Sequence, residues 1–74
     1  MSDLRMLSMA DLAAKGIRYH RESIRRLIRL GLFPRPVKLG SGPTAPNMWP
    51  EHEIDAWLRE RMAARDAASG TAAA

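Results

Sequence analysis

The sequence predicts a mainly helical domain with a small β-hairpin, and three observations predict it. Residues 9–15 and 21–30 each place apolar side chains at helical spacing and are followed by a glycine. Residues 31–49 contain prolines and turn residues, which exclude a long helix and allow two short strands. A third segment of helical spacing follows at residues 50–64. The chain of 74 residues is therefore one small domain.

The first helix has clear signals at both ends. Residues 1–7 before it are expected to form an arm or a short strand. Ser8 is a good N-cap, and Asp11 lies three residues later, as in a capping box. Gly16 suits the left-handed backbone conformation that ends many helices. The pattern thus predicts a helix over residues 9–15.

The second helix, residues 21–30, is amphipathic. Either Tyr19 or His20 precedes it in the capping region, and Gly31 ends it. At 100° per residue its apolar side chains share one narrow sector and most of its charged ones lie opposite. The apolar set is Ile24, Leu27 and Ile28, and the opposite set is Glu22, Arg25, Arg26 and Arg29.

A hairpin is predicted after the second helix. Val37 and Leu39 alternate with Lys38, which indicates a half-buried strand with the lysine outward. Residues 41–46 are turn residues without charge, and residues 47–49 make a return strand. Two helices joined by a short glycine-containing link and followed by a hairpin indicate a winged helix-turn-helix, with the hairpin as the wing.

The end of the chain divides into a helix and a tail. Pro50 suits the first turn of a helix, which we expect over residues 50–64. Residues 65–74 lack large apolar side chains, and we expect them to be disordered. The folded domain is therefore predicted over residues 8–64. Its core needs the few large side chains that the chain has, namely Phe33, Trp49 and Trp57.

The positive charge is concentrated in one segment. The net charge is +4, yet between Lys15 and Lys38 eight basic residues stand against Glu22 alone. Such asymmetry indicates a surface that binds a polyanion. In a helix-turn-helix the second helix enters the major groove of duplex DNA, where arginine recognises guanine. The predicted DNA-contacting residues are Arg18, Tyr19, His20, Arg21, Glu22, Ser23, Arg25, Arg26, Arg29, Arg35, Lys38 and Thr44.

Several of these residues have a second interpretation. Glu22 either stabilises the positive end of the helix or accepts from cytosine. Tyr19 is either a core residue or a DNA contact. Arg25 either lies along the domain edge, covering apolar surface, or faces DNA. A small adaptor that captures an acidic protein would use the same basic helix, and RNA ranks below duplex DNA because only Tyr19 is a credible stacking aromatic.

Other function classes find little support. His20 and His52 stand alone, and the chain has no cysteine, so neither a metal site nor a cofactor is expected. Glu51, Glu53 and Asp55 form an acidic first helical turn rather than a catalytic set, and no enzyme is predicted. No apolar run is long enough for a membrane span, and we expect a soluble intracellular protein.

Four stretches together resemble the AlpA-like prophage regulators, which belong with the small excisionases in the MerR-like winged-helix group. The stretches are residues 7–12, 23–28, 31–40 and 49–58. The resemblance spans about residues 4–62 and implies a cytoplasmic, nucleoid-associated DNA-binding protein of a prophage or integrative element. It implies a transcriptional regulator, or an excisionase that bends attachment-site DNA for an integrase, with copies associating on adjacent sites. The recognition helix would be residues 21–30 and the wing residues 37–49.

Overall fold

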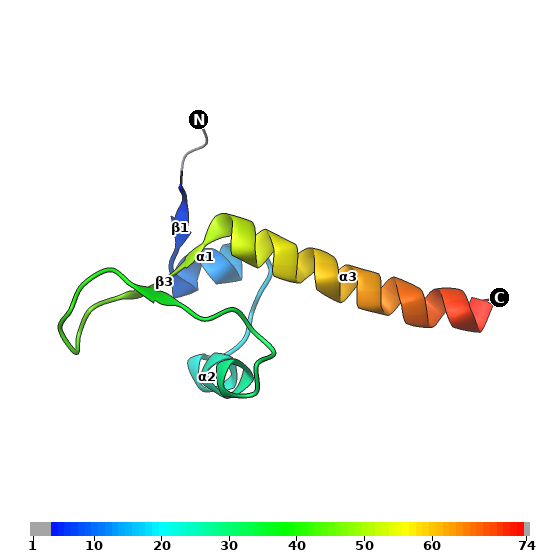
Figure 1. Cartoon of the computed structure of the whole chain (residues 1–74), viewed down its shortest axis with the longest axis horizontal. Helices are drawn as coiled ribbons and strands as arrows, with labels where there is room; N and C mark the ends of the chain where they lie inside the picture. Colours follow the sequence, from blue (N-terminus) through cyan, green and yellow to red (C-terminus); the bar gives the residue numbers. More distant parts are fainter. Residues whose placement is uncertain (1–3, 74) are drawn as a thin grey trace.

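The computed structural model describes residues 4–73 of the chain, and the side chains of residues 4–68. Three helices and one three-stranded sheet make up this part, which confirms the mainly α class with a small hairpin. Figure 1 shows the hairpin and the long last helix extending to opposite sides, with α2 below them. In chain order the elements are β1 (Met6–Leu7), α1 (Met9–Ala14), α2 (Arg21–Arg29), β2 (Val37–Lys38), β3 (Asn47–Pro50) and α3 (Glu51–Ala73).

Helix α1 begins with the predicted capping box. The hydroxyl of Ser8 accepts from the Asp11 amide at 3.2 Å, and the Ser8 amide donates to the Asp11 carboxylate at 2.9 Å. Two free amides at the helix start are thereby satisfied. The same hydrogen bond from the Ser8 backbone holds the pKa of Asp11 below its ordinary value.

The two helices of the helix-turn-helix end in the same way. Gly16 and Gly31 have φ values of +99° and +73°, which favour glycine. After α1 the Ile17 amide donates to Leu12 at 2.9 Å, and after α2 the Leu32 amide donates to the Leu27 carbonyl at 2.8 Å. Each is the hydrogen bond of a Schellman motif that spans five residues along the chain, and it closes the end of the helix. After α1 this turn also returns Ile17 to the core, where it is buried.

The sheet has β3 at its centre, paired antiparallel with β1 on one side and β2 on the other. Leu7 lies opposite Trp49, so the end of the N-terminal segment is a strand rather than a loose arm. The hairpin strand β2 differs from the prediction of a half-buried strand. Val37 and Leu39 are 43% and 55% exposed, because β2 is an edge strand whose side chains lie beyond the small core.

The core takes one buried side chain or more from almost every element. Phe33 stands against Trp49 edge to face, with ring centroids 6.0 Å apart, and against Trp57 at 4.8 Å. Trp57 packs against the core as predicted; it is half-buried, and its Nε1 donates to the Leu32 carbonyl at the surface. The buried residues are Leu7, Leu12, Ile17, Ile24, Phe33, Trp49 and Ile54.

Helix α3 differs from the prediction at both ends. Pro50 is the last residue of β3 rather than the first of the helix, and the next amide, that of Glu51, donates to the Arg5 carbonyl at 2.8 Å. We expected the helix to end near Ala64 and a disordered tail to follow, whereas α3 continues to Ala73. Alanine has the highest helix propensity, so an alanine-rich segment can extend a helix without packing on a core. Ala74 lies outside the described residues.

Lys15 joins α1 to the acidic first turns of α3. Its Nζ lies 2.7 Å from the Asp55 carboxylate and 3.3 Å from that of Glu51. The bond to Asp55 raises the pKa of Lys15, and the bond from Lys15 lowers the pKa of Asp55. Lys15 therefore stabilises the contact between α1 and α3. Within residues 4–68, its charge is paired with these carboxylates, unlike the other basic charges of the segment 15–38.

This pair predicts a pH dependence of stability. Because the folded pKa of Asp55 is lowered, the contribution of the pair is present above the ordinary value of 3.8 and is lost as pH falls through the folded value. At alkaline pH the stabilising contribution of the pair is present below 10.5, the ordinary pKa of lysine. It is lost as pH rises through the raised pKa of Lys15 in the folded protein. Urea unfolding across acidic pH should show a weaker pH dependence in Lys15→Met than in Lys38→Met, whose lysine is exposed. Equal dependence in the two variants would contradict the assignment.

Candidate nucleic-acid interface

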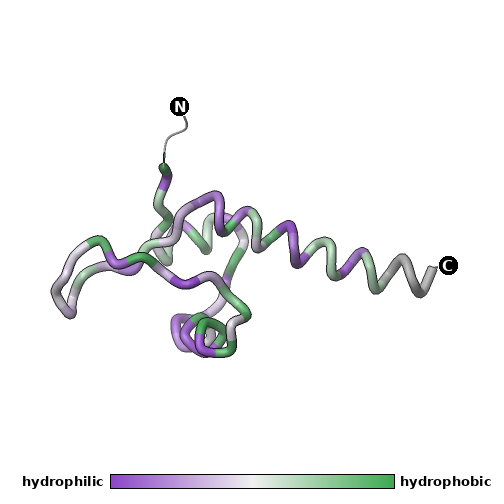
Figure 2. The backbone as a smooth tube through the Cα atoms, viewed as in Figure 1, coloured by the Kyte–Doolittle hydropathy of each residue, from purple (hydrophilic) through white to green (hydrophobic). Residues whose placement is uncertain are grey.

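Helix α2 presents a row of arginines to solvent. Ile24 is buried and Leu27 and Ile28 are half-buried, so this side of the helix packs on the core. Figure 2 shows hydrophobic residues on one side of α2 and hydrophilic residues on the other. All four arginines are exposed, and within residues 4–68 none forms an ion pair with a carboxylate; they are Arg21, Arg25, Arg26 and Arg29.

The start of α2 is accessible from outside. His20 is the N-cap residue, although its side chain makes no capping hydrogen bond. Tyr19 is 49% exposed, so it is a surface residue rather than a core residue. Glu22 lies exposed in the first turn and Ser23 is half-buried. Polar groups thus surround the end of the helix that carries a partial positive charge.

A cleft of about 320 Å³ separates α2 from the hairpin. Arg21 and Arg25 line it from the helix, and Thr44 and Asn47 line it from the hairpin. Asn47 was missing from the predicted contacts, because a single asparagine at the start of a short strand carries no signal until the hairpin is folded against α2. Arg29, one turn after Arg25, lines a neighbouring hollow with Arg25 and Asn47, whereas Arg26 lines neither.

The remaining predicted contacts lie around this helix. Arg18 is exposed in the link before α2, and Arg35 and Lys38 are exposed after it. Between Arg18 and Lys38 there are seven cations and one acid. With Lys15 committed to α3, these seven cations are the exposed positive charge of the domain's basic face.

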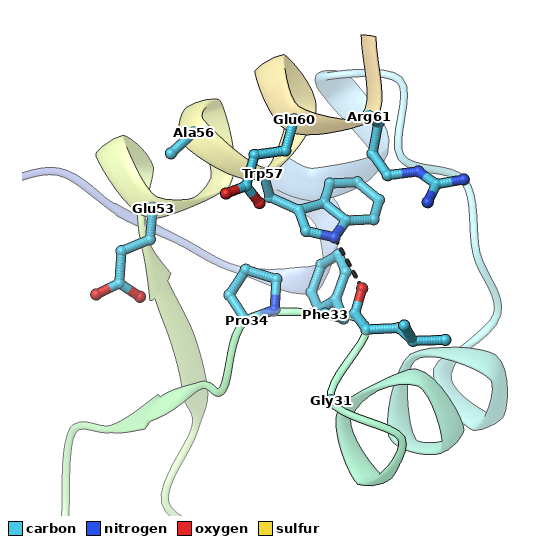
Figure 3. Close-up of a pocket in the computed structure, with 9 residues that line it drawn as sticks. Gly31, Phe33, Pro34, Glu53, Ala56, Trp57, Glu60 and Arg61 are labelled. Carbon is cyan, nitrogen blue, oxygen red and sulfur yellow. Dashed lines mark hydrogen bonds between the residues drawn. The ribbon is translucent and has the colours of Figure 1, made fainter. Parts of the chain in front are cut away.

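A second groove is lined by two carboxylates and by one cation, Arg61. It has a volume of about 500 Å³ and lies between the segment 31–34 and α3. Figure 3 shows Glu53 and Glu60 at this groove, with the Trp57 indole bonded to the Leu32 carbonyl. Carboxylates repel phosphate, so this groove is a poor surface for nucleic acid.

Among the described residues no three His, Cys, Asp or Glu side chains lie close enough together to hold a metal ion. Within the same part of the chain, no helix combines the length and apolar character that crossing a bilayer requires.

Comparison with known proteins places the chain in a family. A family described as "Prophage CP4-57 regulatory protein (AlpA)" matches residues 5–62, which include the helix-turn-helix, the hairpin and the first part of α3. No curated protein and no solved structure matches the chain. The match covers most of the 74 residues, and the chain belongs to the AlpA family of prophage regulatory proteins.

Proposed function

We propose that this protein is a sequence-specific duplex-DNA-binding regulator whose helix α2 enters the major groove. The observation that carries the proposal is the set of four exposed arginines on α2, of which Arg26 and Arg29 lie opposite Ile24. A helix fits the major groove, and arginines on its outer side reach guanine edges and phosphates. An adaptor for an acidic protein would use the same charges, but the helix-turn-helix and the family favour DNA.

In this proposal the interface has three parts. Arg26 and Arg29 face the groove, while Arg21, Arg25, Thr44 and Asn47 contact DNA from the cleft beside the hairpin. Arg18 and Tyr19 before the helix, and Arg35 and Lys38 after it, hold phosphates. Residues 41–46 of the hairpin carry no charge, so this tip contributes backbone amides rather than cations.

The family supports a proposal for the biological role. We propose that the protein regulates transcription or directs excision of a prophage or integrative element, the latter together with an integrase. One small domain covers a short site, and in the excision role several copies on adjacent sites would bend the duplex. A neighbouring integrase gene would favour excision, and a neighbouring lytic or structural operon would favour transcription.

A salt titration tests the proposal. A labelled duplex of about two helical turns, of mixed sequence, should bind at low ionic strength. A plot of the logarithm of the affinity against the logarithm of the salt concentration should be a straight line. Its slope, the salt slope, should be negative, with a magnitude of about 0.9 for each phosphate contacted. Unlabelled duplex should compete better than single-stranded RNA of the same length. Absence of duplex binding at low salt, or stronger binding to polyglutamate, would contradict the proposal.

A further inference from the structure

A basic hollow lies on the side of the domain where the link meets α3. It has a volume of about 380 Å³ and joins residues far apart in the chain. Ile17, Trp57 and Leu58 give it apolar walls, and no carboxylate lines it. Its polar side chains are those of Arg18, Tyr19 and Arg61.

Arg61 is the unexpected member of this set. It lies on α3, outside the basic segment 18–38, and the sequence gives it no role. Residues 54, 57, 58 and 61 share one side of a helix, so Arg61 continues the side by which α3 packs on the core. At this position the core has ended, and the side chain is exposed.

The guanidinium of Arg61 is available for a ligand. Figure 3 shows it on the opposite side of the Trp57 ring from the Glu60 carboxylate. Within residues 4–68 it forms no ion pair. It lines the hollow together with Arg18 and Tyr19, and it also stands at the edge of the groove that Glu53 and Glu60 line.

We propose that Arg61, with Arg18 and Tyr19, forms a phosphate site that holds the DNA backbone beside the start of α2. This inference rests on the proposed function. Two guanidinium groups and a phenol hydroxyl are suitable donors to a phosphodiester, and the apolar walls suit the neighbouring deoxyribose. Arg18 and Tyr19 directly precede His20, the N-cap of α2, so a duplex at this helix end lies near the hollow.

The position of the hollow explains an asymmetry of the domain. Figure 1 shows the hairpin on one side of α2 and the body of α3 extending to the other. The hairpin tip has no cation, so it binds phosphate weakly. The site formed with Arg61 binds phosphate on the other side of α2.

The test compares two arginines of the same helix. Arg61→Ala should weaken binding to every duplex sequence alike and reduce the salt slope by about one, as expected for one lost phosphate contact. Arg59 is exposed and about 200° away around α3, so Arg59→Ala removes the same charge from another side and should leave the slope unchanged. Arg61→Lys should keep the slope because it keeps the charge.

Controls separate a binding role from a structural one. Arg61→Gln retains most of the stem against Trp57, so it should unfold at the same urea concentration as the unaltered chain and still lose about one unit of slope. Equal slopes for Arg61→Ala, Arg61→Gln and Arg59→Ala, in a chain that binds duplex, would overturn this inference and leave the proposed function standing. Absence of duplex binding by the unaltered chain would overturn both.

Discussion

Trp49→Ala should unfold most of the protein at room temperature. Trp49 is 2% exposed, packs edge to face on Phe33 and lies opposite Leu7 in the sheet. Removing a buried tryptophan costs about 3–5 kcal/mol, which approaches the whole stability that so small a core supplies. Circular dichroism and urea unfolding should show lost helix content and a strongly lowered midpoint.

Two further variants show where this loss arises. Trp49→Phe keeps a ring in the core but removes the Nε1 donor that lies 2.9 Å from the Pro34 carbonyl. It should cost about 1–3 kcal/mol, since that carbonyl is left without its partner. Leu4→Ala removes a leucine side chain that is 80% exposed and should change stability by less than about 0.5 kcal/mol. A Trp49→Ala protein as stable as Leu4→Ala would show that the core is organised differently.

The second large effect concerns binding. Arg26→Ala and Arg29→Ala should each weaken duplex binding about tenfold, and the double variant about a hundredfold, if each arginine contributes about 1–3 kcal/mol. Both residues are exposed on the side of α2 opposite Ile24, so the fold should be preserved. Fluorescence anisotropy with a labelled duplex measures the affinity, and circular dichroism checks the fold.

A matched control removes the same amount of charge elsewhere. Arg5→Ala with Arg59→Ala lowers the net charge by the same amount, from positions outside the proposed interface. Its affinity should stay close to that of the unaltered chain. If the two double variants lose affinity equally, net charge rather than α2 governs binding, and the recognition helix lies elsewhere.

The parts of the fold predicted correctly are those with local causes. Ser8 and Asp11 are three residues apart, and their reciprocal hydrogen bonds need nothing beyond that turn. The two helix-ending glycines likewise adopt a conformation that their own residue type allows. Ile24, Leu27 and Ile28 reveal the buried side of α2 through their spacing alone.

The errors concern contacts between distant parts of the chain. The sequence places Lys15 in the basic segment, because its partner Asp55 lies 40 residues away and the pairing exists only after folding. Trp57 packs on the core as predicted, but the hydrogen bond from its Nε1 to the Leu32 carbonyl joins residues 25 positions apart and could not be predicted from composition. Residues 65–73 lack large apolar side chains but are rich in alanine, so the absence of an apolar side does not predict where α3 ends.

The candidate site shows the same division. Exposure of Arg25, Arg26 and Arg29 follows from helical spacing, and the structure places all three in solvent. Asn47 and Arg61 could not be found in this way, because the hollows that they line exist only after the hairpin and α3 have packed beside α2.

The pairing of β1 with β3 makes residues 6 and 7 indispensable to the domain. Leu7 is 1% exposed, and its strand covers one edge of β3 through the register Leu7 to Trp49. A polypeptide whose translation started at the internal Met9 would lack both this leucine and the Ser8 cap. It would expose the side of Trp49 and an open strand edge, which invites aggregation. A start at Met6 or before it is therefore needed to keep this strand and the cap.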